Sequence, residues 1–138
     1  MEINLKGHLA LVTGGSGQLG RVMCRTLADC GADVAVHYHR NETKANSLVS
    51  ELIAKGVRAQ AFQADVTVKE EVDQLRREVV TSLGNPDILV NNAVIQYNWV
   101  HVLDQNPADY ESQFRSCVLH NVLMVQAFAP SMVSQKWG

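Results

Sequence analysis

The chain has 138 residues and a mass of 15.2 kDa, which is enough for one domain and too little for two ordinary ones. Hydrophobic residues make up 46% and charged residues 19%, so the chain can bury a core, and no uninterrupted apolar run approaches the ~18 residues of a membrane span. Twelve Lys and Arg against fourteen Asp and Glu give a formal charge of −2, without the basic excess of a nucleic-acid-binding protein.

Short apolar runs alternate with stretches of helical periodicity along most of the chain. The apolar runs predict strands over residues 8–13, 33–38, 58–64 and 87–90, the first of them buried on both faces. Helical spacing of apolar side chains predicts the buried stripes of three intervening helices. The stripes are Leu19, Val22, Met23, Thr26, Leu27 and Cys30; Ala45, Leu48, Val49, Leu52 and Ile53; and Val68, Val72, Leu75, Val79 and Leu83. Gly31, Gly56 and Gly84 follow them as helix ends.

Local signals also predict how two helices begin. Thr67 and Glu70 have the spacing of a capping box, in which each side chain bonds the other's backbone N–H. Residues 92–105 lack a clear period and are expected to form a loop, after which Asn106 at the N-cap and Pro107 at the first position open a fourth helix. Pro130 is expected to end or kink this helix. Its predicted apolar face carries Tyr110, Phe114, Val118, Val125 and Phe128.

Strand-then-helix units joined by short loops predict a parallel sheet with right-handed crossovers, which is a doubly wound, Rossmann-like α/β fold. We expect one domain over residues 1–138. The three cysteines, Cys24, Cys30 and Cys117, have no metal-ligand spacing and no disulfide framework, so they are interpreted as buried, reduced thiols and no metal site is expected. Reduced thiols, and a start without a signal-peptide pattern, favour a cytoplasmic protein.

The turn between the first strand and the first helix carries the strongest chemical signal. Gly15, Gly17 and Gly20 fit G-x-G-x-x-G, in the strand-to-helix context of a dinucleotide site. The pattern supplies a tight turn, close backbone approach to a diphosphate and close packing of the helix on the strand. Free N–H groups at the helix start then face the phosphates. No Gly-Lys-Ser/Thr follows, so a P-loop is excluded.

Together with this turn, three later segments resemble the short-chain dehydrogenase/reductase family over the full length of the chain. Residues 63–67, Gln-Ala-Asp-Val-Thr, look like the family's adenine-contacting Asp segment. Residues 87–93, Asp-Ile-Leu-Val-Asn-Asn-Ala, look like its fourth strand and Asn-Asn-Ala-Gly motif, and Gln126-Ala127 with Pro130 and Met132 like the end of its fourth helix. Within the family the chain resembles 3-oxoacyl-carrier-protein reductases. The resemblance implies the strand order 3-2-1-4 and hydride transfer between a nicotinamide cofactor and a carbonyl or alcohol.

Three positions depart from the family pattern. Compact members usually have Gly where this chain has Gln18, and the observed glycine spacing is that of extended reductases and epimerases of nucleotide sugars, which stay a minor alternative. Val94 replaces the last Gly of Asn-Asn-Ala-Gly and is expected to crowd the nicotinamide side of the cleft. The family's fourth-helix Asn falls on Cys117, interpreted as a helix-packing thiol, and Asn121 lies about 6 Å further along the helix.

The residues after the second strand bear on the choice of cofactor. In NAD-binding relatives an acidic residue occupies the position of Tyr38 and bonds the adenosine ribose. Here Arg40 either pairs with a 2′-phosphate or is a solvated loop residue, and we expect NADP(H) rather than NAD. Asp65 bonds the adenine, caps the third helix, or does both. The expected cofactor-binding residues are Thr13, Gly14, Ser16, Gly17, Gln18, Leu19, Gly20, Tyr38, His39, Arg40, Asp65, Val66, Asn91 and Ala93.

The catalytic residues of the family are missing from these 138 residues. The resemblance implies a Ser, and a Tyr whose pKa is lowered by a Lys four residues on. At that spacing Tyr38, Tyr97 and Tyr110 are followed by Glu42, His101 and Phe114. We therefore expect a truncated chain, the N-terminal part of a longer reductase, inactive by itself. Residues 87–91 would then form a sheet edge that pairs across an oligomer contact, and the fourth helix is by resemblance an oligomer-forming surface.

Two other functions fit the same residues. One is a non-catalytic nucleotide-binding module, and the other is a structural domain with a vestigial site, consistent with Val94 and Cys117. The substrate is not readable, and Tyr97, Trp99 and His101 either line its pocket or anchor a loop. The expected partners are a nicotinamide dinucleotide, a small carbonyl or alcohol substrate and further copies of the chain, with neither nucleic acid nor membrane.

Overall fold

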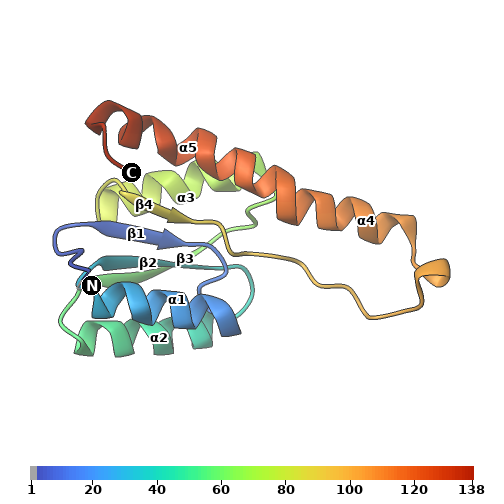
Figure 1. Cartoon of the computed structure of the whole chain (residues 1–138), viewed down its shortest axis with the longest axis horizontal. Helices are drawn as coiled ribbons and strands as arrows, with labels where there is room; N and C mark the ends of the chain where they lie inside the picture. The colour runs from blue at the N-terminus through green and yellow to red at the C-terminus, as the bar shows by residue number, and fades with distance from the viewer. Residues whose placement is uncertain (1–2) are drawn as a thin grey trace.

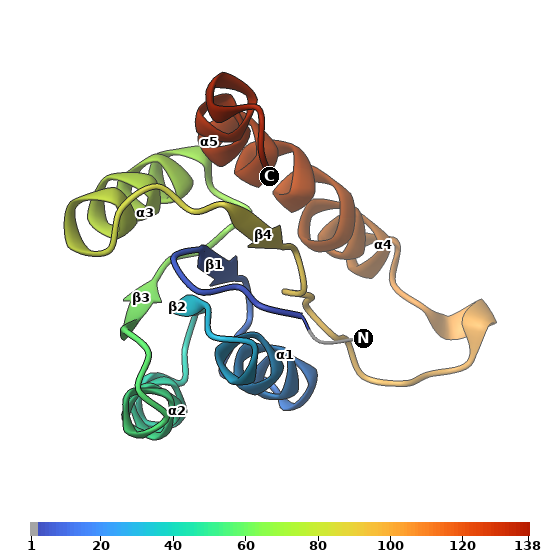
Figure 2. The same cartoon turned by 60° about the vertical axis from the view of Figure 1, so that its left-hand side comes forward.

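The computed structural model describes residues 3–138, which form a four-stranded parallel sheet with helices on both faces. The strands are β1 (Leu9–Val12), β2 (Asp33–Tyr38), β3 (Ala59–Gln63) and β4 (Ile88–Val90). Figures 1 and 2 show α1 (Gln18–Asp29) and α2 (Glu42–Ala54) on one face and α3 (Lys69–Ser82) and α5 (His120–Gln135) on the other. The order of the strands is β3-β2-β1-β4, so the doubly wound α/β fold and its predicted strand order are confirmed.

Two apolar cores, one on each face of the sheet, hold the helices in place. β1 lies between them and is buried along its whole length, because it has a helical layer above and below. Cys24 belongs to the core under α1 and α2, where burial raises the pKa of its thiol to about 12. The prediction of a buried thiol is confirmed for Cys24, whereas Cys117 is exposed and does not pack the helix against the core.

The buried face of α1 differs from the predicted stripe. Leu19 and Val22 are 61% and 55% exposed, and the buried residues are instead Gly20, Cys24 and Ala28, spaced four apart. A Cβ on Gly20 would lie 2.2 Å from the carbonyl oxygen of Gly14, so the helix sits directly on the turn before it. That close approach turns the small side chains of α1 toward the sheet and Leu19 and Val22 outward, while Met23 and Leu27 of the predicted stripe pack at the edge of the core.

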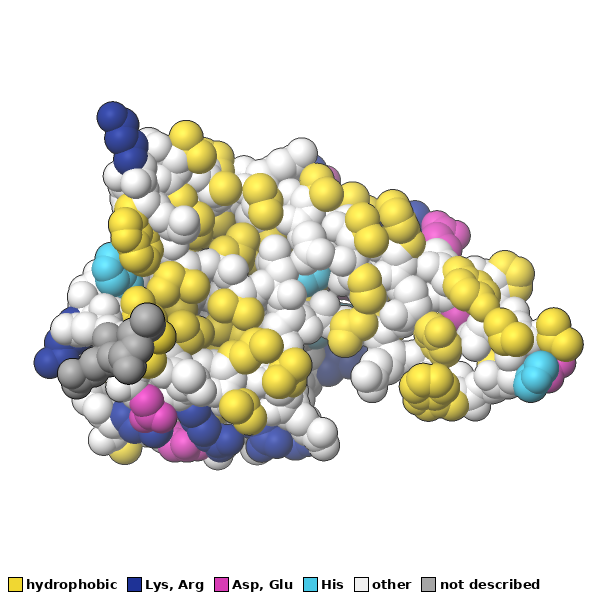
Figure 3. All heavy atoms as spheres, viewed as in Figure 1, with side chains coloured by type: hydrophobic (Ala, Val, Ile, Leu, Met, Phe, Trp, Pro, Cys, Tyr) yellow, Lys and Arg dark blue, Asp and Glu magenta, His cyan; other side chains and the backbone are white. Residues whose placement is uncertain are grey.

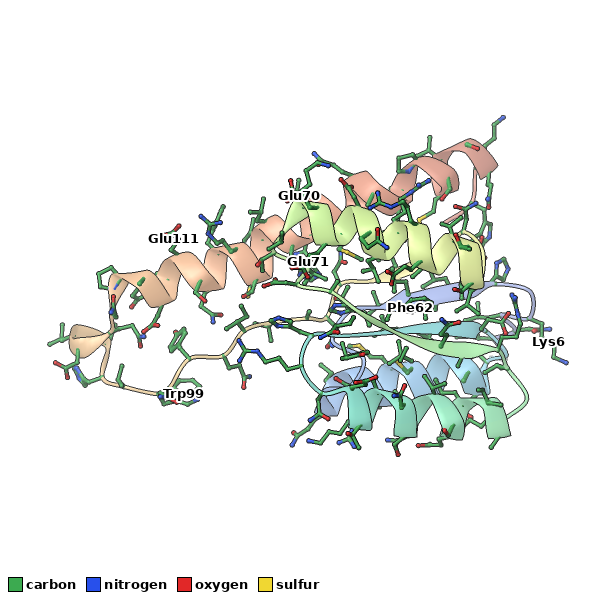
Figure 4. The ribbon with its side chains drawn as sticks, turned by 180° about the vertical axis from the view of Figure 1, so that it is seen from behind. Lys6, Phe62, Glu70, Glu71, Trp99 and Glu111 are labelled. Atoms are coloured by element: carbon green, nitrogen blue, oxygen red, sulfur yellow. The ribbon has the colours of Figure 1, made fainter. Side chains whose placement is uncertain are left out.

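The start of α3 has no side-chain cap, and the predicted Thr67–Glu70 pair is replaced by bonds within the turn before the helix. Asp65 Oδ1 accepts hydrogen bonds from the backbone N–H (2.9 Å) and the hydroxyl (2.6 Å) of Thr67, while Glu71 Oε2 accepts from the backbone N–H of Asp65 (2.6 Å). Figure 4 labels Glu70 and Glu71 at this end of α3. The predicted capping box is therefore wrong. The Asp65 carboxylate, two residues upstream, occupies the hydroxyl and the N–H of Thr67, and the helix begins after Val68 at the N-cap. Asp65 closes a turn just before α3 and does not cap the helix itself, because its bonds end on Thr67, which precedes the N-cap.

The last helical run also buries a face that the sequence pattern did not predict. α4 (Pro107–Phe114), with Asn106 as its N-cap as predicted, continues through a π-helical turn (Arg115–Leu119) into α5, which passes Pro130 without ending. The buried side chains are Ser116, His120, Met124 and Phe128. Of the predicted face only Phe128 is buried, and Tyr110, Phe114, Val118 and Val125 are exposed. The π turn adds a residue to the helix, which shifts the register of any stripe drawn with a constant 3.6-residue period.

The run Pro107–Gln135 contains an 18-residue window with a mean hydropathy of 1.3, so by length and composition alone it could cross a membrane. In the structure, however, its inner face carries Met124 and Phe128, which belong to the same core as Leu75 and Val79 of α3. The helix is thus one layer of the domain, and its remaining apolar side chains face outward over the upper side of the molecule (Figure 3).

This assignment of the buried face can be tested on two adjacent residues. Met124→Ala removes a side chain with no exposed surface and is expected to lower the free energy of unfolding by ~2–5 kcal/mol. Val125→Ala, the matched control on the outer face, is expected to change it by less than about 0.5 kcal/mol. Urea unfolding followed by circular dichroism measures both, and equal losses would show that the helix is rotated from this position.

Candidate functional site

A cavity of about 770 Å³ lies at the carboxyl ends of the parallel strands. This is where ligands bind in open α/β sheets, outside the strand ends where the chain order reverses, here between β1 and β4. Most of the predicted cofactor residues line it, namely Gly14, Ser16, Gly17, Gln18, Leu19, Gly20, His39, Arg40, Asp65, Val66 and Ala93. Thr13, Tyr38 and Asn91 lie outside the lining. Lining residues that the sequence analysis did not propose include His37, Asn92 and Ser116.

The glycine-rich turn presents backbone N–H groups to this cavity. Gly14 has φ 64°, in the left-handed region, and its carbonyl accepts a hydrogen bond from the N–H of Gly17 (2.9 Å). α1 then starts at Gln18 with no side-chain cap and no acidic residue in its first turn. The first N–H groups of a helix have no acceptor within it, and they carry partial positive charge. The turn is therefore built to bind an anion.

Thr13 joins the ends of β1 and β4 below the turn. Its fully buried hydroxyl accepts hydrogen bonds from the backbone N–H groups of Asn92 (2.9 Å) and Ala93 (3.0 Å). The Asn92 side chain donates in return to the carbonyl of Thr13 (2.9 Å). Thr13 thus supports the turn from behind, and of the Asn91–Asn92 pair it is Asn92 that faces the cavity while Asn91 points outward.

Two buried histidines also hold the turn. His37, 1% exposed, accepts a hydrogen bond on Nδ1 from the N–H of Gly14 (3.0 Å), and its Nε2 is 3.0 Å from the carbonyl of Ala64. His120 Nε2 is 3.1 Å from the hydroxyl of Thr13. Burial lowers the pKa of both imidazoles, that of His37 to about 4, so both are neutral near neutral pH. The sequence signal that could have indicated this role is that His37 is a polar residue within the largely apolar strand 33–38.

The π turn explains why His120 can reach Thr13. The backbone N–H of His120 bonds the carbonyl of Arg115, five residues back, which frees the carbonyl of Ser116. His120 Nδ1 lies 2.9 Å from that carbonyl, and Asn121 Nδ2 donates in the same way to the carbonyl of Cys117 (2.6 Å). Side chains thus replace the main-chain bonds that the π turn removes and fix the imidazole beside the strand ends.

The rim at the end of β2 and β3 carries the charged groups of the cavity. Arg40 is exposed in the lining, and His39 Nε2 lies 3.9 Å from Asp65 Oδ2. Burial acts to raise the pKa of Asp65, but the hydrogen bonds from Thr67 outweigh it and the pKa is lowered, so the carboxylate is ionised. Tyr38 points to the opposite side of the strand, into the core with α2 and beside a second hollow over β3. The expectation that its side chain lies in the cofactor site is wrong, because side chains alternate along β2 and His37 takes the cavity side.

Residues 97–101 leave the cavity on a projecting arm between β4 and α4 (Figures 1 and 4). The lining ends at Gln96, and Trp99 is 98% exposed on the arm. Tyr97, Trp99 and His101 do not line this cavity, and their role in a substrate pocket or as loop anchors stays a prediction.

Comparison with known proteins places this site in a family. The profile of the family described as short chain dehydrogenase matches residues 8–138. The chain belongs to the short-chain dehydrogenase family. It is 41% identical over 107 residues to the 3-oxoacyl-[acyl-carrier-protein] reductase of Staphylococcus epidermidis, in an alignment that covers 70% of this chain and 44% of the relative. It is 34% identical over 134 residues to the 3-oxoacyl-[acyl-carrier-protein] reductase of Synechocystis, in an alignment that covers 97% of this chain and 54% of that relative. The chain thus spans about half the length of the curated relatives it matches.

Solved structures agree with this assignment. A blue fluorescent protein from a metagenomic library, crystallised with NADPH, superimposes with a TM-score of 0.85 at 39% identity, covering 94% of this chain and 53% of its own. A short chain dehydrogenase from Burkholderia cenocepacia, crystallised with NADP, superimposes with a TM-score of 0.84 at 35% identity. This superposition covers 92% of this chain and 51% of the Burkholderia chain. Both likenesses extend over nearly the whole of the chain.

Two of the departures from the short-chain dehydrogenase pattern can now be placed. Val94 lines the cavity beside Ala93 and is 50% exposed, so its branched side chain narrows the mouth without entering the core. Gln18 stands at the first position of α1 and also lines the cavity. Neither substitution closes the turn, because the positions that approach other backbone atoms most closely, Gly14 and Gly20, are both glycine.

The neutral state of His37 makes the fold sensitive to acid. The pKa is 6.5 in an ordinary histidine and about 4 here, so the unfolded chain binds more protons between these values. The stabilisation is complete above about pH 6.5 and is lost as the pH falls toward 4. We expect His37 to account for a loss of about 2 kcal/mol in the free energy of unfolding between about pH 7 and pH 5.

Urea unfolding at the two pH values measures this loss, and His37→Asn, which cannot bind a proton, is the control. The variant should retain the part of the acid sensitivity that comes from other groups and lack the part from His37. If the free energy of unfolding fell equally with pH in both proteins, the pKa of His37 would be the same in the folded and the unfolded chain, contrary to this prediction.

Proposed function

We propose that this chain binds NADP(H) and forms the nucleotide-binding part of an oxidoreductase acting on a carbonyl or alcohol substrate. The observation that carries the proposal is the uncapped start of α1 on the glycine-rich turn, open to a cavity large enough for a dinucleotide. A Cβ on Gly14 would lie 3.0 Å from the Cα of Ala93, so the narrow turn accepts only glycine there. Two similar structures are described as complexes with NADPH and NADP, which supports the proposal.

The residues of the cavity fit the parts of the dinucleotide. The N–H groups from Gln18 to Gly20, at the start of α1, would bind the diphosphate, and the rim at His39 and Arg40 would face the adenosine ribose. Asp65 and Val66 would contact the adenine, and Ala93 with Val94 would border the nicotinamide. When bound, the nicotinamide would supply or accept the hydride. The protein's own part is to hold the diphosphate and to orient the ring toward the open side of the sheet beyond β4.

The preference for the phosphorylated cofactor rests on charge at the end of β2. The ribose-binding position carries Tyr38, turned into the core, so no carboxylate at that position repels a 2′-phosphate. Arg40, the next cation along the rim, can pair with the phosphate through two N–H groups. Asp65 is ionised but already accepts two hydrogen bonds from Thr67.

For the whole protein we propose reduction of a 3-oxoacyl thioester or a similar carbonyl compound, on the likeness to the two 3-oxoacyl-[acyl-carrier-protein] reductases. None of the three tyrosines has a lysine four residues on, so we propose that these 138 residues bind the nucleotide and do not turn over substrate. The free cysteines favour a cytoplasmic protein, and the balanced charge lacks the basic excess that a nucleic-acid partner requires.

We also propose that copies of the chain associate through the outer face of α4 and α5 and the free edge of β4 at residues 87–91. Phe114, Val118, Val122, Val125 and Val133 are all exposed on these helices. Among residues 3–138, β4 pairs only with β1 and leaves its other edge open. Exposed apolar surface of this extent is typical of protein–protein contacts, and an open parallel edge invites another strand.

Arg40→Met tests the cofactor preference. We expect it to weaken NADPH binding roughly tenfold and to leave NADH binding unchanged, because only NADPH carries the 2′-phosphate. Arg76→Met on the exposed side of α3 changes the net charge equally and is the control. The measurement is the enhancement of nicotinamide fluorescence on titration. A wild-type chain that bound neither nucleotide would contradict the proposed function, and an equal loss for both would contradict only the role of Arg40.

Val118→Glu with Val122→Glu tests the association of copies. The two charges are expected to shift the sedimentation coefficient toward that of a monomer, because they cannot be buried unpaired in an apolar contact. Ile53→Glu places a charge on the equally exposed surface of α2 and should leave sedimentation unchanged. A wild-type chain that sediments as a monomer at every concentration would contradict the proposal.

A further inference from the structure

His37 connects two loops that bind different parts of the proposed ligand. Its imidazole lies between the glycine-rich turn, through the N–H of Gly14, and the loop after β3, through the carbonyl of Ala64. The backbone of His37 makes a further contact with the turn, since its carbonyl accepts a hydrogen bond from the N–H of Gly15 (2.8 Å). Ala64 directly precedes Asp65 and Val66, which line the cavity. One side chain therefore spans the distance between the expected diphosphate and adenine sites.

The two hydrogen bonds determine the proton position on the ring. Gly14 N–H can only donate, so Nδ1 must present a lone pair, and the carbonyl of Ala64 can only accept, so Nε2 must carry the proton. A neutral ring in this tautomer satisfies both neighbours, and a doubly protonated ring satisfies one. The charged or titratable groups nearest His37 are His120, His39 and Asp65, and none of them provides another hydrogen-bond partner for the ring.

His120 holds the neighbouring residue by the same logic. The carbonyl of Ser116 can only accept, so Nδ1 of His120 carries the proton and donates to it. The unprotonated Nε2 then accepts from the hydroxyl of Thr13. That hydroxyl accepts from the N–H groups of Asn92 and Ala93, and its own proton points at His120 Nε2 (3.1 Å) rather than at the more distant carbonyl of Val90 (3.4 Å). Thr13 is therefore fixed from the α5 side, and Gly14, the residue at which the turn changes direction, depends on His37.

We propose that His37 is a positioning residue of the nucleotide site, which holds Gly14 in its left-handed conformation and keeps the turn and the β3–α3 loop in register for one dinucleotide. This inference rests on the proposed function. If the imidazole were removed, the N–H of Gly14 would lose its acceptor in a part-buried position, and rotation of that group toward the water in the cavity would become favourable. The N–H groups at the start of α1 would then no longer point at a common place.

Two amide variants separate the two bonds. Asn has its Oδ1 two bonds from Cβ, as Nδ1 is in histidine, so His37→Asn keeps an acceptor for Gly14 and loses the donor to Ala64. Gln has its Nε2 three bonds from Cβ, as Nε2 is in histidine, so His37→Gln keeps the donor and loses the acceptor. His37→Phe removes both. Val34→Ala, a buried truncation earlier in the same strand and outside the cavity lining, controls for loss of stability alone.

The experiment is titration of each protein with NADPH, followed by nicotinamide fluorescence, at a temperature where circular dichroism shows the variant folded. We expect His37→Asn to bind within about threefold of the wild type, and His37→Gln and His37→Phe to bind roughly tenfold more weakly or worse. Val34→Ala should bind as the wild type does. If His37→Phe does not fold, the comparison of Asn with Gln decides the question.

Three outcomes would overturn the inference, and they differ from failure of the proposed function. Equal affinity in the Asn and Gln variants would show that the bond to Gly14 does not position the turn. Equal weakening in Val34→Ala would show that affinity follows stability alone. Wild-type affinity in His37→Phe would show that the two ring nitrogens of His37, and their hydrogen bonds, have no role in NADPH binding. Failure of the wild type to bind NADPH would instead reject the proposed function itself.

Discussion

The contact between the start of α1 and the turn that precedes it sets the geometry of the whole site. A Cβ on Gly20 would stand 2.2 Å from the carbonyl oxygen of Gly14, so only glycine allows the helix to begin there. Because the helix begins there, its unpaired N–H groups open onto the strand ends, and small residues of α1 face the sheet. The anion-binding turn and the tight layer of helix on strand are thus two consequences of one close approach.

Behind the turn lies a small set of buried polar groups, each with a partner. Thr13, His37 and His120 are all within 1% of complete burial. Apart from the bond between Thr13 and His120, the hydrogen bonds of their side chains reach backbone groups of the glycine-rich turn, the segment after β4, the loop after β3 and the π turn before α5. Buried polar groups are costly unless satisfied, so such a network tolerates few alternative arrangements. The site is therefore held by elements from both faces of the sheet, although the cavity itself is formed by loops.

The sequence pattern was most informative where local chemistry decides the structure. The strands, the glycine turn and the Asn106–Pro107 helix start follow from short-range preferences, and the structure confirms them. The pattern failed for the buried face of the last helix, because the π turn at residues 115–119 breaks the constant period on which the stripe was drawn. It failed for the start of α3 because Asp65 and Thr67 were free to form a bond that the spacing rule does not consider.

The residues of the candidate site divide in the same way. The sequence by itself determined the fold class and the position of the anion-binding turn, since these depend on strand–helix alternation and on glycine spacing. The lining residues outside the turn, such as Arg40, Asp65 and Ala93, were predicted from the family resemblance. Only the tertiary structure decided that Tyr38 turns into the core while His37 faces the turn, and that His120 reaches Thr13 from 107 residues away in the chain. Contacts of that kind depend on strand alternation, helix register and the position of a π turn, and no local pattern in the sequence specifies all three at once.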